Sequence, residues 1–266
     1  MINFDTDKLI LIYYPSGAGG KFLKNSLGLS DFSVFQSSTL ADDQINGKFS
    51  KLDKINYLIN ELDNIHDKWN DLNLGCWELA GPAAAGVASL KTMNLNDNIR
   101  QYFEFFKVIE DLTNKNYYFF LGCHDITELA KTANFWPNAK IIEFINYEPF
   151  QEKYRKINDN NYSIVKGSDW PKKFPSIDEY LNLDKNIQEE IITYYPGFEY
   201  FKNNSSQAKR VIFQWDTENY MSYDKTLRDF KELCSILKLH DIDFNSFELY
   251  YRRWVDKLCE LSPNYK

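Results

Sequence analysis

The chain of 266 residues has few of the side chains from which structural metal sites are built. Structural zinc sites need clustered thiolate and imidazole ligands, with cysteines in closely spaced pairs. Here the cysteines are far apart, no C-x-x-C pair occurs, and there are only three histidines. We therefore expect no metal in this protein. The residues concerned are Cys76, Cys123, Cys234, Cys259, His66, His124 and His240.

The sequence also lacks the features that direct a chain to membranes or to nucleic acids. No apolar run approaches the roughly 18 residues that a membrane span requires, and no charged-then-apolar leader opens the sequence. Because 38 acidic residues outnumber 31 basic ones, the formal net charge is −7, which provides no global positive field. We expect a cytoplasmic protein that binds neither membranes nor nucleic acid. Any site for an anion must be local.

The order of apolar patterns predicts the fold class. Buried-strand patterns occur at 9–13, 117–123, 139–145 and 211–215, a shorter one occurs at 32–36, and helical patterns separate them. This alternation predicts an α/β fold with three layers, α/β/α, around a central parallel sheet. We expect a single domain, 1–266, with a helical insertion at about 37–113 and a polar insertion or lid at about 158–206. Helices are predicted at 21–27, 52–65, 99–112, 125–135, 149–157, 223–238 and 244–260.

A glycine-rich stretch near the start is the most informative feature of the sequence. It reads Tyr14-Pro15-Ser16-Gly17-Ala18-Gly19-Gly20-Lys21-Phe22 and lies between an apolar strand pattern and a helical one. Glycines let the backbone turn with its N–H groups pointing inward, and a helix N-terminus adds about half a positive charge. Lys21 can supply a full charge. The stretch predicts a phosphate-binding loop, although a plain glycine-rich turn from strand to helix also accounts for it.

The loop departs from the nucleoside-triphosphatase pattern G-x-x-x-x-G-K followed by Ser or Thr. Pro15 stands at the first glycine of that pattern, and Phe22 stands where the pattern has the hydroxyl that binds Mg²⁺. A bound phosphate ester needs no metal ligand at that position. The sequence therefore favours a phosphate ester over a metal-bound triphosphate. A nucleotide-dependent kinase, with Asp125 or Asp216 as the acid that binds the metal, is the alternative.

Four segments, in order along the chain, together resemble the sulfotransferase family. Tyr14-Pro15-Ser16-Gly17 is similar to the family's Y-P-K/R-S-G-T-T loop, and Gly122-Cys123-His124-Asp125 resembles its K-T/S-H motif. Pro137-Asn138-Ala139-Lys140 precedes an apolar strand, as the corresponding P-N-A-K segment does in that family. Arg210 to Asp216, with the apolar helix positions after it, is similar to the family's C-terminal strand and helix. The resemblance covers most of the chain.

The resemblance implies a P-loop-like fold and a sulfonate donor, 3′-phosphoadenosine 5′-phosphosulfate (PAPS). The acceptor would be the hydroxyl or amine of a small molecule or glycan. His124 would be the general base toward the acceptor, and Lys21 would stabilise charge on the phosphosulfate. The donor-binding positions that it implies are Ser16, Gly17, Ala18, Gly19, Gly20, Lys21, Phe22, Asn146 and Tyr154.

Both positions that usually contact the 3′-phosphate differ from the family pattern, and the lysine or arginine ahead of Ser-Gly in the loop and the lysine of the K-T/S-H motif are missing as well. Asn146 stands where the family has the arginine that binds the 3′-phosphate, and Tyr154 stands where it has a serine. Arg155, or Arg252 and Arg253, could supply the positive charge instead. The differences leave open a third reading, in which the chain is a non-catalytic binding module with a degenerate donor site. The sequence predicts neither the acceptor nor the oligomeric state.

Overall fold

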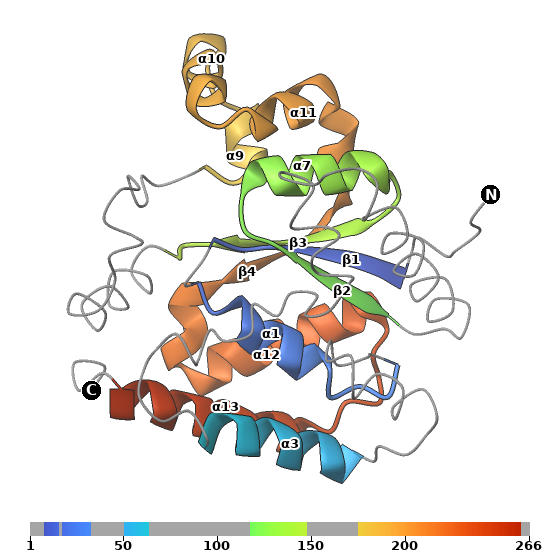
Figure 1. Ribbon diagram of the computed structural model, residues 1–266, viewed down its shortest axis with the longest axis vertical. Coiled ribbons are helices and arrows are strands. Elements are labelled where there is room, and N and C mark those ends of the chain that lie inside the picture. Colours follow the sequence, from blue (N-terminus) through green and yellow to red (C-terminus); the bar gives the residue numbers. More distant parts are fainter. Residues whose placement is uncertain (1–7, 16–17, 33–50, 64–117, 148–174, 262–266) are drawn as a thin grey trace, which may run out of the picture.

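The computed structural model describes residues 8–15, 18–32, 51–63, 118–147 and 175–261. At its centre lies a parallel sheet of four strands in the order β2-β1-β3-β4, as Figure 1 shows. The predicted strands at 9–13, 117–123, 139–145 and 211–215 are confirmed to within two residues at each end. Their bounds are β1 (Leu9–Tyr13), β2 (Phe119–Cys123), β3 (Lys140–Ile145) and β4 (Val211–Asp216).

Strand β1 lies between two neighbours and is apolar on both faces, which explains its unbroken run of large aliphatic side chains. The first four of its side chains have no exposed surface. Its last residue, Tyr13, pairs with Cys123 of β2 on one side and with Glu143 of β3 on the other. The carboxyl ends of β1 and β2 therefore meet at one edge of the sheet, with that of β3 beside them.

One face of the sheet is covered by α1 (Gly20–Leu27), α3 (Lys51–Asp63), α12 (Tyr223–Leu237) and α13 (Phe244–Leu261). These helices lie below the sheet in Figure 1. Their apolar side chains form one core cluster with Ile10, Ile12, Phe144 and Trp215 of the strands, and α3 packs against α13. The periodic patterns at 21–27, 52–65, 223–238 and 244–260 predicted these four helices from the sequence.

The other face is covered by α7 (Ile126–Phe135), α9 (Ile177–Leu181), α10 (Lys185–Tyr194) and α11 (Gly197–Asn203), which Figure 1 shows above the sheet. The described part of the expected lid, 175–206, is helical, and α9 and α11 bury four large side chains in the core with Leu9, Leu11 and Tyr13. The four are Ile177, Tyr180, Phe198 and Phe201, none with exposed surface. These helices are thus part of the layer that covers the sheet.

The close contact between α11 and α7 depends on a glycine. A Cβ on Gly197 would lie 2.4 Å from the backbone carbonyl of Ile126. Only a residue without a side chain lets the two backbones approach so closely. Gly197 therefore fixes α11 against the start of α7, directly after β2.

Arg210 joins the ends of three elements. It is the last residue of 3₁₀ helix η3 (Ser205–Arg210), directly before β4, and its guanidinium donates to the carbonyls of Ala133, Trp136 and Ala139 at 3.1, 2.7 and 2.6 Å. These carbonyls belong to the end of α7 and to the turn into β3. One planar side chain therefore satisfies the backbone of the turn that precedes β3.

The parallel α/β arrangement and its helices on both faces agree with the prediction from the sequence. The predicted strand at 32–36, of which only Phe32 is described, and the helices at 99–112 and 149–157 lie outside the described residues. Among the helices that the structure describes, none combines the length and apolar character needed to cross a lipid bilayer.

Candidate functional site

The predicted phosphate-binding loop lies at the carboxyl edge of the sheet, between β1 and α1. Within it the Ala18 N–H donates to the Pro15 carbonyl at 3.0 Å, and the Phe22 N–H donates to the Gly19 carbonyl at 3.0 Å. The structure describes Pro15 and then Ala18 onward, so Ser16 and Gly17 lie outside the described residues. The loop is short, because only six residues separate the end of β1 from the start of α1.

Two glycines give the described part of the loop its shape. Gly19 is the N-cap of α1 and has a φ of +79°, which L-amino acids with side chains rarely adopt. A Cβ on Gly20 would lie 2.3 Å from the ring of Tyr14. Gly19 is therefore required by its backbone conformation, and Gly20 by the ring that fills the space beside it.

Helix α1 begins at Gly20 and directs its N-terminus at the loop. The N–H groups of the first turn of any α-helix have no carbonyl partner within the helix, and the helix dipole adds partial positive charge there. Lys21 is the second residue of α1, and the first turn contains no acidic residue. Backbone dipoles and sequence together make this end of α1 suitable for an anion.

Tyr220 holds the loop from 201 positions later in the chain. It lies in 3₁₀ helix η4 (Thr217–Met221), and its hydroxyl donates to the Gly19 carbonyl at 3.1 Å. Burial raises the pKa of Tyr220 well above its ordinary value, so the hydroxyl stays protonated and remains a donor. The Tyr220 carbonyl in turn accepts from the Tyr251 hydroxyl at 2.7 Å. This positioning contact was not predicted from the sequence.

Phe22, expected among the donor-binding residues, has its ring in the core. The ring is 1% exposed, and its centroid lies 4.4 Å from that of Trp254 and 5.6 Å from that of Tyr220. The residue therefore anchors α1 to α13 through its side chain. Its backbone N–H, at the loop, donates to the Gly19 carbonyl.

His124 follows the last residue of β2 and lies beside Tyr14, which follows the last residue of β1. The Tyr14 N–H donates to the Cys123 carbonyl at 3.0 Å, and the ring centroids of Tyr14 and His124 are 4.8 Å apart. His124 Nδ1 lies 3.2 Å from the Tyr14 carbonyl oxygen. A carbonyl can only accept, so this contact assigns the proton to Nδ1 and leaves Nε2 as the basic nitrogen of the neutral ring.

Asp125 and Glu128 fix the backbone around His124. Asp125 is the N-cap of α7, and its Oδ1 accepts from the Glu128 N–H at 2.7 Å. The Glu128 side chain reaches back, and its Oε2 accepts from the His124 N–H at 2.8 Å. This reciprocal pattern is a helix-capping arrangement. Both carboxylates thus accept from backbone N–H groups at the start of α7 and so help to fix the position of His124.

The expected 3′-phosphate positions are described only in part. Asn146 follows β3, has a φ of +52° and is half-buried, and its carbonyl accepts from Thr217 Oγ1 at 2.8 Å. Tyr154 and Arg155 lie outside the described residues. Arg252 pairs with Glu248 at 2.6 Å, and Arg253 pairs with Asp63 of α3 at 2.5 Å. These two arginines are thus engaged by carboxylates on the helical layer.

A buried carboxyl close to the same edge was not predicted as a functional residue. Glu143 of β3 is 1% exposed, and its Oε1 accepts from the Ile177 N–H at 2.8 Å while Gln214 Nε2 donates to its Oε2 at 3.3 Å. Burial raises its pKa to about 7. Glu143 pairs across the sheet with Tyr13, and burial raises the pKa of Tyr13 as well. The one signal of Glu143 in the sequence was an acidic residue within a strand that is apolar apart from Glu143 and Lys140.

Within the described residues, no group of three or more His, Cys, Asp or Glu side chains could hold a metal ion. Comparisons of the chain with protein-family models, with curated proteins and with solved structures find no match. A functional interpretation therefore depends on the chemistry of the loop, of α1 and of His124.

Proposed function

We propose that the chain is a sulfotransferase-like protein that binds PAPS at the loop and transfers its sulfonate to a hydroxyl or amine. The observation that carries the proposal is the meeting of two features at one sheet edge. A glycine turn leads into the N-terminus of α1, and directly after the neighbouring strand β2 lies His124, whose contact with the Tyr14 carbonyl leaves Nε2 as its basic nitrogen. An anion site beside a base suits the transfer of an anionic group to a neutral acceptor.

The core position of Phe22 favours sulfonate transfer over a kinase reaction. A kinase of the P-loop type needs a hydroxyl at this position to bind Mg²⁺. Here the side chain points into the aromatic contact with α13, so this position supplies neither a hydroxyl nor access to a metal. A phosphosulfate can be held by backbone N–H groups and a lysine without a metal.

In the proposed reaction the acceptor oxygen or nitrogen forms a bond to sulfur, and the bond from sulfur to the bridging phosphate oxygen breaks. That oxygen keeps the electron pair and leaves as part of adenosine 3′,5′-bisphosphate. His124 Nε2 takes the proton of the acceptor, while Lys21 and the N–H groups of the loop stabilise the charge on the leaving phosphate. Nε2 is buried in the structure, so an acceptor, or a water molecule in its place, would reach it only after neighbouring groups move aside.

Calorimetric titration with adenosine 3′,5′-bisphosphate, with and without Mg²⁺, tests the donor site. We expect binding that Mg²⁺ does not strengthen, that weakens in Lys21→Ala and that persists in Lys225→Ala, an exposed lysine of α12. No detectable binding at millimolar ligand would exclude PAPS chemistry. ATP binding that requires both Mg²⁺ and Lys21 would favour the kinase alternative.

Release of labelled sulfate from PAPS tests catalysis without a known acceptor, because water can serve as a slow one. His124→Ala should leave bisphosphate binding unchanged and lower the release by about 10²-fold or more, as the loss of a general base does. His240→Ala is the matched control, since His240 is exposed in the loop between α12 and α13. Release that is equal in all three proteins would remove His124 from the mechanism. Bound bisphosphate with no release would favour the non-catalytic reading.

A further inference from the structure

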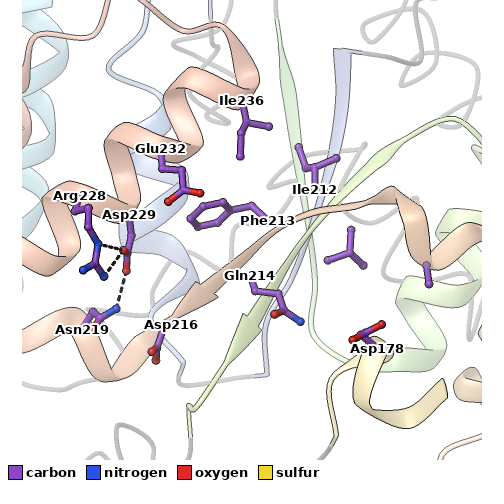
Figure 2. Close-up of a pocket in the computed structure, with 12 residues that line it drawn as sticks. Asp178, Ile212, Phe213, Gln214, Asp216, Asn219, Arg228, Asp229, Glu232 and Ile236 are labelled. Atoms are coloured by element: carbon purple, nitrogen blue, oxygen red, sulfur yellow. Dashed lines mark hydrogen bonds and ion pairs between the residues drawn. The ribbon is translucent and has the colours of Figure 1, made fainter. Parts of the chain in front are cut away.

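A groove runs along β4 on the side away from β3. Its cavity has a volume of about 560 Å³, and Figure 2 shows the strand crossing it between α12 on one side and Asp178 of α9 on the other. Within the described residues β4 is the last strand of the sheet. The groove is lined by Asp178, Ala208, Val211, Ile212, Phe213, Gln214, Asp216, Asn219, Arg228, Asp229, Glu232 and Ile236.

The part of β4 within the groove is a regular strand. The register shifts at Ile212, which is the extra residue between Val211 and Phe213, and pairing with β3 is then regular from Phe213 to Asp216. An edge strand directs alternate backbone N–H and C=O groups away from its one neighbour, and these groups can pair with an added strand. The floor of the groove is therefore a template for an extended backbone about four residues long.

Both walls of the groove are acidic. Asp229 and Glu232 of α12 form one wall, with Phe213 and Ile236 beside them, and Asp178 of α9 lies on the opposite wall. Arg228 is the only basic side chain among the lining residues that the structure describes, and it pairs with Asp229 at 2.9 Å. With Asp216 at one end of the strand, the lining carries four carboxylates against one guanidinium, which favours a cationic occupant.

We propose that this groove binds an extended, basic peptide segment of another protein, which adds to β4 as a further strand. Successive side chains of an added strand point to opposite faces of the sheet. Adjacent Lys or Arg residues would thus meet Glu232 on one wall and Asp178 on the other. Phe213 and Ile236, which is 41% exposed, would contact the aliphatic parts of these side chains.

The charges disfavour a second copy of this chain in the groove. Pairing β4 of one molecule with β4 of another would bring two sets of four carboxylates together, in a chain whose net charge is already −7. Like charges placed opposite each other destabilise strand pairing. A basic segment gains from the same field. This proposal concerns a surface separate from the loop and His124, and it does not depend on the proposed transferase activity.

The probe is a fluorescent, end-blocked hexapeptide, Val-Lys-Arg-Thr-Lys-Val, titrated with the full chain and followed by anisotropy. Two related peptides accompany it, one with glutamate in place of each basic residue and one with alternate backbone amides N-methylated. We expect the basic peptide to bind, the acidic one not to bind, and N-methylation to weaken binding about tenfold or more, because it removes backbone donors. Equal affinity of the methylated and unmethylated peptides would refute strand addition.

Charge reversal on both walls tests the position of the site. The double variant Asp178→Lys with Glu232→Lys should weaken binding of the basic peptide about tenfold or more. Glu190→Lys with Asp256→Lys makes the same change in net charge at exposed positions of α10 and α13 and should have little effect. Equal losses in both variants, or no binding at 1 mM peptide in about 50 mM salt, would overturn the proposal. A dimer in sedimentation that is disrupted by Asp178→Lys with Glu232→Lys, but not by the control variant, would also overturn the proposal, since a second copy of the chain would then occupy β4.

Discussion

Glu143→Gln is expected to remove most of the pH dependence of stability between pH 5 and 8. In the folded chain the pKa of Glu143 is raised from its ordinary 4.5 to about 7, mainly by burial, with the charges of Glu179 and Asp178 adding to the effect. The backbone N–H of Ile177 and the amide of Gln214 oppose the rise by stabilising the carboxylate. Burial prevails because the side chain is 1% exposed in a layer between the sheet and α9.

The direction of the effect follows from proton linkage. Because the pKa is higher in the folded chain, the folded state binds the proton more tightly than the unfolded state does between pH 4.5 and 7. The stability provided by protonated Glu143 is fully present below pH 4.5 and is lost as the pH rises through 7. The whole difference in pKa corresponds to about 3 kcal/mol.

Glutamine retains the shape and hydrogen bonding of the neutral carboxyl. Its side-chain oxygen can accept from the Ile177 N–H, and Gln214 can rotate its amide so that the two side chains remain paired. We therefore expect Glu143→Gln and the unaltered chain to be similarly stable at pH 5. At pH 8 the variant should be more stable by up to about 3 kcal/mol, because it has no carboxylate to ionise in the core.

Urea unfolding at several pH values, followed by tryptophan fluorescence, measures this difference. Trp136 and Trp215 report on the two cores, since each is at most 5% exposed and they lie on opposite faces of the sheet. Glu190→Gln, on the exposed surface of α10, controls for the loss of one carboxylate. If Glu143→Gln and Glu190→Gln show the same change in unfolding free energy from pH 5 to pH 8, the reasoning about Glu143 is refuted.

Three further predictions concern residues that hold the loop and the sheet in place, each measured as the free energy of unfolding. Gly20→Ala places a Cβ 2.3 Å from an aromatic ring and should cost about 2 kcal/mol or more, whereas Gly28→Ala, at a helical φ of −64°, should change stability by less than about 1 kcal/mol. Phe22→Thr introduces the hydroxyl of the P-loop pattern but should lower the free energy of unfolding by about 3 kcal/mol, because the side chain faces the core. For the same reason it should create no Mg²⁺-dependent nucleotide binding. Such binding would show that the position faces the loop. Arg210→Lys cannot satisfy three carbonyls in one plane and should cost about 1–3 kcal/mol, and a loss no larger than that of Lys209→Arg would contradict this.

The strands and long helices were predictable because their signals are local. Leu9 to Tyr13 forms a continuous apolar run, and the apolar residues of α13 repeat with helical spacing over 18 residues. The helices α9 and α11 have five and seven residues, too few for a period to emerge. They are held by side chains such as Tyr180 and Phe198, whose partners lie elsewhere in the chain. The segment therefore resembled an insertion in the sequence.

The same division applies to the candidate site. The glycine loop was predicted because a strand, a turn and a helix follow one another within a few residues. His124 was proposed because its segment resembles a motif of the sulfotransferase family. Tyr220 could not be identified, since its hydroxyl reaches Gly19 only through the fold. Glu143 was visible as an acid in a mainly apolar strand, but its pKa is raised by burial beneath α9, which is a tertiary feature, and the Gln214 amide only opposes that rise.

Phe22 gives the clearest case in which one residue has both a local and a tertiary explanation. From the sequence it was the residue that breaks a metal-binding pattern. In the structure its ring packs against both Trp254 and Tyr220, and the Tyr220 hydroxyl also donates to the Gly19 carbonyl. The side chain that removes a metal ligand therefore belongs to the same contact that fixes the turn at Gly19 and the N-terminus of α1. A fixed backbone turn at a helix N-terminus can bind an anion by its N–H groups alone. The packing of the Phe22 ring therefore accounts both for the missing hydroxyl and for the shape of the loop.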